Sequence, residues 1–187
     1  MVMRARRYYK LPALIRLYKS HVLPYAERST PAIFHAHGSV LSVLDRVQDN
    51  FLEDVGVCSK SALLDFNLAP LVSRRDIAML GLLHRTQIGT APSCISSFFP
   101  RAKHTLFNHN SSVAPPHNRQ IQCEIEPGST ASFCRSLFGL VRVYNYLPAN
   151  VVQVNTVSTF QSHLQKLMKI SASNDDPSWS LMFHVDN

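Results

Sequence analysis

Residues 63–89, with the sequence LLDFNLAPLVSRRDIAMLGLLHRTQIG, constrain the fold most, because a helix start, an apolar run and a helix stop follow one another there. Ser73 precedes Asp76 by three residues, which is the spacing of a capping box over backbone N–H groups that lack helical partners. Glycine readily takes the left-handed conformation that ends helices, and Gly89 is followed closely by Pro92. The pattern predicts a helix that begins just after Ser73 and ends before Gly89.

The faces of this helix indicate that it is largely buried. Ile77, Leu80 and His84 share one face at spacings of three and four residues, and apolar side chains fill much of the remaining surface. A helix that is apolar on most sides belongs in a protein core. We expect the solvent to reach only these side chains of the helix: Arg74, Arg75, Arg85 and Gln87.

The charge of the chain is unevenly distributed. Its 187 residues carry a net charge of +7, and residues 1–28 hold seven Lys or Arg side chains against the single acid Glu27. Residues 74–142 form a second basic block, and the stretch between the two blocks has more acids than bases. Such asymmetry favours nucleic acid or another acidic partner, although a basic surface is often only a solvated one.

Helical periodicity extends to both sides of the central helix. A basic helix is expected within residues 1–28, a linker or short extended piece at residues 30–38, and an amphipathic helix between Ser39 and Gly56. Thr156 is placed to cap a last helix. The apolar stripe of the first helix is Leu14, Ile15, Tyr18, Val22 and Tyr25. The stripe of the amphipathic helix is Val40, Leu44, Val47, Phe51 and Val55.

These patterns predict a mainly α protein, an irregular helical domain of about five helices over residues 1–170. Residues 93–130 interrupt it as a Pro-rich, basic, loop-rich insert that has room for one short β-hairpin. Residues 171–187 are polar, and we expect them to form a frayed tail. The longest apolar run of the helices is far shorter than the roughly 20 residues that span a bilayer, so we expect no transmembrane helix.

Histidines and cysteines give little support for a metal site. His35 and His37 would share one face of a strand, but no third or fourth ligand follows at a spacing typical of zinc. The four cysteines are widely separated and contain no Cys-x-x-Cys pair. We expect reduced thiols, no metal and no other cofactor. The cysteines are Cys58, Cys94, Cys123 and Cys134.

Three groups of motifs in a fixed order carry a resemblance to a known family. The first is the paired arginines, Asp-Ile-Ala-Met-Leu-Gly and His-Arg of residues 74–85. Upstream lie LYKSHVLPYAERSTPAIFHA and LDRVQDNFLEDVG, and downstream lie FCRSLFGLVRVYNYLPANVV and STFQSHL. Each motif alone is weak. Together they resemble the region downstream of the polymerase domain in reverse transcriptases of non-LTR retrotransposons, over residues 9–167.

The resemblance implies a parent RNA-directed DNA polymerase, whose catalysis depends on two metal ions held by aspartates in a rigid turn. The only adjacent aspartates here, Asp175 and Asp176, lie in the polar tail without a flanking strand pattern. We therefore expect a non-catalytic C-terminal fragment of a retrotransposon polyprotein and not an enzyme. Its expected partners are RNA or DNA and, in an intact parent, the upstream polymerase domain. We expect it inside the cell, in the cytoplasm or nucleus, and not at a membrane.

Basic side chains in both blocks are the candidate phosphate contacts. Tyr8 and Tyr9 precede the first helix and either stack on bases or pack against the following helix, and we favour packing. Three aromatic residues lie among the basic side chains of the insert and are further candidates for stacking, namely Phe98, Phe99 and Phe107. The candidate nucleic-acid-binding residues are Arg4, Arg6, Arg7, Lys10, Arg16, Lys19, Arg74, Arg75, Arg101 and Lys103.

Two alternatives remain open. The first 26 residues are rich in Arg and free of acids, which is the composition of a mitochondrial presequence. Under this alternative, we expect a helical protein-binding or mitochondrial structural protein whose basic N-terminus is cleaved near Tyr25. Two prolines and a low serine content in the first 26 residues argue against it. An enzyme assembled from scattered groups such as His84, Cys134 and Asp76 has no specific motif to support it.

Overall fold

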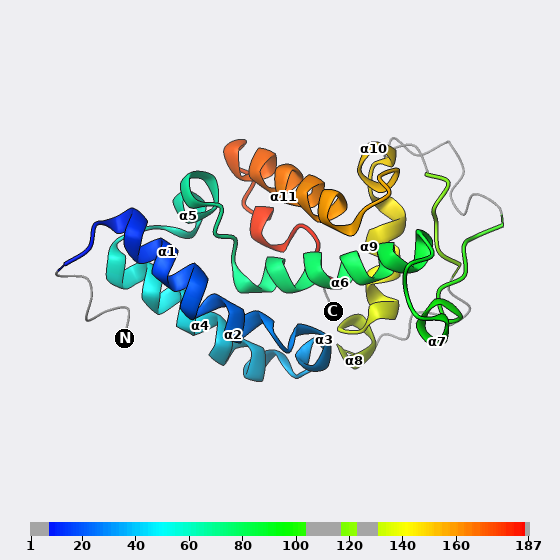
Figure 1. Ribbon diagram of the computed structural model, residues 1–187, viewed down its shortest axis with the longest axis horizontal. Coiled ribbons are helices and arrows are strands. Elements are labelled where there is room, and N and C mark those ends of the chain that lie inside the picture. The colour runs from blue at the N-terminus through cyan, green and yellow to red at the C-terminus, as the bar shows by residue number, and fades with distance from the viewer. Residues whose placement is uncertain (1–7, 104–116, 123–130, 186–187) are drawn as a thin grey trace. The chain divides into compact units, whose positions relative to one another are not determined.

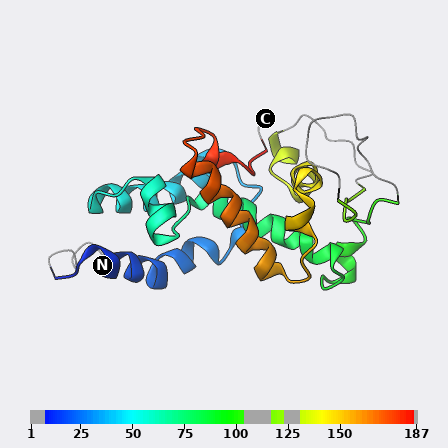
Figure 2. The same ribbon diagram turned by 90° about the horizontal axis from the view of Figure 1, so that it is seen from above.

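The computed structural model of the chain describes residues 8–103, 117–122 and 131–185. These residues are mainly helical, as the periodicity predicts, and the helices run from α1 in blue to α11 in orange (Figures 1 and 2). Within these ranges, strand pairing is limited to one antiparallel bridge between Arg101 and Ile121. Most residues that a hairpin in the insert would need lie outside the described part. No described helix is both long and apolar enough to cross a membrane.

The chain divides into two compact units. Unit 1 comprises Met1–Arg75 and Met168–Met182, and unit 2 comprises Asp76–Leu167 and Phe183–Asn187. Two long helices, α6 and α11, contribute residues to both units. Helical periodicity alone does not predict this division, because a helix pattern continues unbroken from one unit into the next. The bounds of these two helices are Leu71–Gln87 for α6 and Val157–Ser173 for α11.

Unit 1 packs short N-terminal helices against a long one. Its helices are α1 (Leu11–His21), α2 (Leu23–Glu27), α3 (Thr30–Ile33), α4 (Gly38–Val55), α5 (Ser59–Phe66) and the 3-10 turn η2 (Trp179–Leu181). Tyr18 of α1 stacks on Phe51 of α4 with ring centroids 4.3 Å apart, so α1 lies along α4 (Figure 1). The buried core is Ile15, Tyr18, Leu23, Phe51, Leu52, Ala62, Leu68 and Leu71.

Two expectations about the N-terminal region are wrong. The segment expected to be extended contains α3, because a proline at position 31 sits in the first turn of a helix, where proline fits well. Tyr25 is exposed and does not continue the apolar stripe of α1. The chain starts a new helix, α2, after Val22 with Pro24 in its first turn, and this restart changes which face is buried.

α4 forms where the sequence predicts it, but its buried face is different. Gly56 ends the helix in the left-handed conformation with a φ of 73°, as expected. Val40 and Val47 of the predicted stripe are nonetheless exposed, whereas Phe51 of the stripe is buried as predicted, together with Gln48 and Leu52. Gln48 Nε2 donates a 2.9 Å hydrogen bond to the carbonyl of Ala69, which lies outside the helix. Val43, which is not part of the predicted stripe, is exposed as well.

The central helix is present, but its predicted cap is wrong. α6 begins two residues before Ser73, and the N–H of Arg74 donates to the carbonyl of Pro70. Ser73 therefore lies inside the first turn, and its hydroxyl donates to the carbonyl of Ser180. Asp76 is buried and lies 3.3 Å from His184 Nδ1. A partner from the distant C-terminal segment thus replaces the local cap.

Unit 2 gathers short helices around the second part of α6 and the first part of α11. Its own helices are α7 (Ser93–Ser96), α8 (Ala131–Cys134), α9 (Leu137–Tyr146) and α10 (Ala149–Val152). Thr156 caps α11 as predicted, because its hydroxyl accepts the N–H of Thr159 at 3.2 Å. Buried side chains of unit 2 include Leu80, Leu83, His84, Leu140, Tyr144, Phe160 and Leu164.

The C-terminal segment is ordered where a frayed tail is expected. α11 continues to Ser173, and Ser171 and Ala172 are buried within it. The Asp176 carboxylate then accepts hydrogen bonds from the hydroxyl of Ser171 and from the N–H of Ser178. Phe183 is also buried. Residues 171–183 therefore belong to the folded structure.

Candidate nucleic-acid interface

The start of α1 exposes aromatic and cationic groups together. Lys10 has extended backbone and immediately precedes the helix. Tyr8 and Tyr9 are 83% and 53% exposed, so the favoured expectation that they pack against the helix is wrong. Arg16 is exposed as well, on the side of α1 away from its buried residues. We refer to Tyr8, Tyr9, Lys10 and Arg16 as the α1 surface. Arg4, Arg6 and Arg7 lie outside the described residues.

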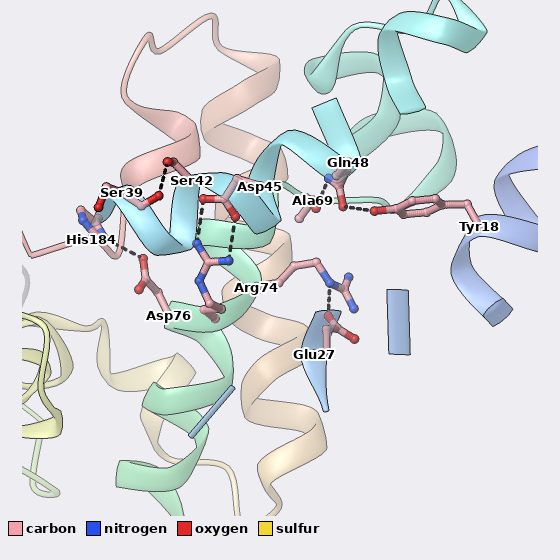
Figure 3. Close-up of polar contacts among 11 residues, drawn as sticks. Tyr18, Glu27, Ser39, Ser42, Asp45, Gln48, Ala69, Arg74, Asp76 and His184 are labelled. Carbon is pink, nitrogen blue, oxygen red and sulfur yellow. Dashed lines mark hydrogen bonds and ion pairs between the residues drawn. The ribbon is translucent and has the colours of Figure 1, made fainter. Parts of the chain in front are cut away.

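Two further cations of unit 1, Lys19 and Arg74, contact groups far away in the sequence. Lys19 Nζ donates to the carbonyl of Phe66 at 2.9 Å. Arg74 pairs through Nε with Glu27, as Figure 3 shows. Sequence reasoning placed these groups in solvent because their partners lie 47 residues away along the chain.

Arg75 is a structural residue and not a surface contact. It is only 5% exposed, and its two terminal nitrogens donate to the two carboxylate oxygens of Asp45 at 2.7 and 2.9 Å. Figure 3 shows the two parallel bonds that end on Asp45. A guanidinium that is buried in a bidentate pair has its charge satisfied internally. The expectation that Arg75 faces solvent or phosphate is therefore wrong.

The second basic region lies in unit 2. Phe98 is 61% exposed just after α7. Phe99 is buried with its ring centroid 5.1 Å from that of Phe138, so the expectation that Phe99 is available for stacking is wrong. Phe107 lies outside the described residues. Arg101 and Lys103 are exposed on the segment that follows. We refer to Phe98, Arg101 and Lys103 as the loop surface. It places one aromatic ring and two cations within six residues.

Buried amide groups hold the loop surface in place. Gln87 Nε2 donates to the carbonyl of Phe99 at 2.9 Å, and Arg101 donates to the backbone carbonyl of Gln87. Asn145 bonds both backbone groups of Ile121, the residue that bridges to Arg101, at 2.8 and 2.9 Å. Gln87, expected to face solvent, is thus buried as a support for the basic segment.

A second set of polar groups is buried in the core of unit 2. His84 Nε2 donates to the carbonyl of Val154 and Nδ1 accepts from the hydroxyl of Tyr144, both at 3.0 Å. His117 Nε2 donates to the Tyr144 carbonyl at 3.0 Å, and its Nδ1 accepts the N–H of Arg119. Burial lowers the pKa of His84 to about 4 and also lowers that of His117. Both imidazoles are therefore neutral near pH 7.

These buried groups do not form an accessible catalytic centre. His84 has no exposed surface and stacks on Phe160 with centroids 4.2 Å apart. Of the adjacent aspartates, Asp175 pairs with Lys60, and hydrogen bonds from Ser171 and Ser178 lower the pKa of Asp176. Within residues 8–103, 117–122 and 131–185, no group of three His, Cys, Asp or Glu side chains is placed to hold a metal ion.

Sequence reasoning did not connect Lys169 with Lys19. Lys169 of α11 belongs to unit 1, and its positive charge acts on Lys19, which lies 150 positions earlier in the sequence. No local pattern connects two residues at that separation.

No protein-family model matches the chain, and comparisons with curated proteins and with solved structures give no match either.

Proposed function

We propose that the chain is a non-catalytic C-terminal fragment of a retrotransposon reverse transcriptase that binds nucleic acid with little sequence preference. The observation that carries this proposal is the exposure of aromatic rings beside cations in both units, at the α1 surface and at the loop surface. Cations attract phosphates, and aromatic rings stack on any base without contacting base edges. The combination suits single strands better than duplexes, whose bases are already stacked.

The distribution of the cations sets the expected strength of binding. Of the candidate residues in the described part, Lys10, Arg16, Arg101 and Lys103 are exposed, whereas Arg75 is committed to Asp45. About two to four phosphate contacts give weak binding whose log K falls with log salt at roughly −0.7 per contact on single strands. We therefore expect measurable affinity at low salt and little at high salt.

Fluorescence anisotropy with labelled single-stranded RNA, single-stranded DNA and duplex DNA over a salt series tests the proposal. Replacing Lys10 and Arg16 together by Gln should lower the affinity and reduce the salt slope by about 1.4, since each single-strand contact contributes roughly 0.7. Arg46→Gln, at an exposed position of α4, is the control and should change neither. Absence of binding at low salt, or binding without salt dependence, would remove the proposal.

The tyrosines give a second, independent arm of this experiment. Replacing Tyr8 and Tyr9 by Ala should weaken single-strand binding by about 10-fold or more, because stacking contributes roughly 1–3 kcal/mol per base. Tyr25→Ala removes an equally exposed ring of unit 1 that lies outside the α1 surface, and it should have little effect. Equal losses in the two variants would contradict stacking at the α1 surface.

The absence of catalysis is part of the proposal and has its own test. The purified chain should incorporate no nucleotide on a primed RNA template with magnesium or manganese, because two-metal catalysis needs rigidly placed carboxylates. Template-dependent extension that stays with the protein through purification would overturn the fragment hypothesis.

The alternative of a cleavable N-terminus predicts a different outcome in cells. Cleavage near Tyr25 would remove four buried side chains of unit 1, namely Leu14, Ile15, Tyr18 and Leu23. Loss of that much buried apolar surface would expose the partners of these residues on α4 and α5. Intact-mass measurement of the protein from cells distinguishes the two: a mature species beginning after Tyr25 favours the mitochondrial alternative.

A further inference from the structure

One helix of unit 2 exposes a cation and an aromatic ring that are not among the residues selected from the sequence. Leu140 and Tyr144 are buried on one side of α9. On its other side Arg142 is exposed, and Tyr146 is 41% exposed. Residues four apart on a helix are neighbours on its surface, so these two side chains share one face. We refer to Arg142 and Tyr146 as the α9 face.

Hydrogen bonds place the α9 face beside the loop surface. Asn145 Oδ1 accepts the N–H of Ile121 at 2.8 Å, and Asn145 Nδ2 donates to the Ile121 carbonyl at 2.9 Å. Ile121 in turn pairs with Arg101 in the antiparallel bridge, so one segment of chain separates α9 from the loop surface (Figures 1 and 2). Arg142 and Tyr146 lie about 60° and 100° around α9 from Asn145, in the same direction. The α9 face therefore adjoins the line along which α9 holds the basic segment.

Carboxylates are scarce around these two surfaces. Among the residues of unit 2 that the structure describes, Asp76 is the only acid, and it is buried beside His184. The other acids of the unit, Glu124, Glu126 and Asp186, lie outside the described residues. Arg142 takes part in none of the ion pairs of the described chain. An exposed guanidinium without a counter-ion attracts phosphates.

We propose that Arg142 and Tyr146 continue the loop surface, so that unit 2 binds one single strand of nucleic acid across both. This inference rests on the proposed function and adds a contact face to it. Arg142 donates to phosphate oxygens, and the ring of Tyr146 stacks on an unpaired base. Asn145 is a positioning residue, because its two hydrogen bonds hold Ile121, and with it the bridged backbone of Arg101, against α9.

Fluorescence anisotropy of the whole chain with a labelled single-stranded RNA over a salt series tests the role of Arg142. Arg142→Gln should reduce the salt slope by roughly 0.7, the contribution of one contact on a single strand. Lys166→Gln removes the same charge from an exposed position of α11 in unit 2 and is the matched control, with an unchanged slope expected. Equal losses of slope in the two variants would overturn the α9 face, because they would show an effect of net charge alone.

The ring of Tyr146 is tested separately from the charge. Tyr146→Ala should weaken binding of the single strand at least about fivefold, because a stacking platform is lost. Tyr146→Phe keeps the ring and should recover most of that loss. Circular dichroism verifies that both variants keep the helical content of the wild type. Wild-type affinity in the Ala variant, or an equal loss in both variants, would overturn stacking at the α9 face.

Crosslinking separates this inference from the proposed function. RNA substituted with 4-thiouridine is irradiated on the whole chain, and mass spectrometry identifies the modified peptides. Modification of both the peptide with Phe98 and the peptide with Tyr146 supports one continuous face. Modification at the loop surface or the α1 surface without any at Tyr146 overturns the α9 face and leaves the proposed function standing. Absence of binding at low salt removes both.

Discussion

The buried ion pair of unit 1 and the buried histidines of unit 2 accommodate polar groups in opposite ways. In unit 1 a charge is kept and paired, since the guanidinium of Arg75 is buried against the Asp45 carboxylate. At His84 and His117 of unit 2 charge is suppressed, because burial favours the neutral forms of both imidazoles. Burial likewise raises the pKa of the Tyr144 hydroxyl, which bonds to His84.

This difference separates what each unit tolerates. Unit 1 accommodates the buried charge of Arg75 while its ion-pair partner is present. Removing one partner leaves the other charge without its counter-ion. The histidine core of unit 2, His84 and His117, does not tolerate an added charge, because a proton on His117 Nδ1 would face the backbone N–H of Arg119 that this nitrogen accepts. We therefore expect the ion pair of unit 1 and the histidine core of unit 2 to respond differently to mutation and to pH.

The largest expected effect comes from placing a charge in the core of unit 2. Leu80→Asp buries an unpaired carboxylate at a site without exposed surface and should cost more than about 5 kcal/mol, enough to unfold a marginal domain. Asp49→Ala, at an exposed position, should be nearly silent. Circular dichroism during urea unfolding measures both variants, and comparable losses would show that the assigned faces are wrong.

Breaking the buried pair of unit 1 should have the next largest effect. Asp45→Asn leaves the Arg75 guanidinium buried without its counter-charge and should cost about 4 kcal/mol. Replacing both partners with apolar residues, Asp45→Leu with Arg75→Met, should recover most of that loss. Urea unfolding followed by Trp179 fluorescence, which reports on unit 1, measures the difference. A double variant no more stable than Asp45→Asn would contradict the charge argument.

Acidification should act on unit 2 through its histidines. The pKa of His84 is about 4 in the folded protein and about 6.5 in the unfolded chain, so its full contribution to stability is present above pH 6.5. That contribution is lost as pH falls from 6.5 towards 4 and amounts to at most about 3 kcal/mol. The groups that face His84 are Tyr144, His117 and the cationic Arg119, and none is a carboxylate that would stabilise a proton.

Hydrogen exchange of α9 amides, corrected for the intrinsic rate, measures this loss within unit 2. His84→Gln should lower the protection at pH 7 and flatten its dependence on pH, because the titrating group is gone. His35→Gln removes an exposed imidazole of unit 1 and should leave the profile unchanged. Protection of α9 that stays constant down to pH 4 would contradict the assignment of a neutral buried imidazole.

Sequence reasoning succeeded where the signal is local. Gly56 ends α4 and Thr156 caps α11 because each acts on backbone groups within four residues of itself. The placement of His84 on a buried face follows from the periodicity of its own helix. Helix existence and fold class are likewise local properties, and they were predicted correctly.

Sequence reasoning failed where the hydrogen-bond partner of a side chain lies far away in the sequence. Arg75 and Asp45 lie 30 residues apart, and Ser73 and Ser180 lie 107 apart, so no window of sequence links them. A charged residue on a helix is normally solvated, and that prior placed Arg75 in water. For the candidate site, the exposure of Lys10 and Arg16 agrees with the sequence, whereas Arg75 does not.

The smallest predicted effect compares one thiol from each unit. Cys58 caps α5, and hydrogen bonds from the hydroxyl and the backbone N–H of Ser61 lower the pKa of its thiol. Cys94, in unit 2, is also exposed. A thiolate is the reactive form, although its nucleophilicity falls as its pKa falls, so the gain in rate is only partial. We expect iodoacetamide at pH 7 to modify Cys58 a few-fold faster than Cys94, as quantified by mass spectrometry of the two peptides. Ser61→Ala should remove most of that advantage while leaving Cys94 unchanged, and equal rates in the wild type would show that the cap does not activate the thiol.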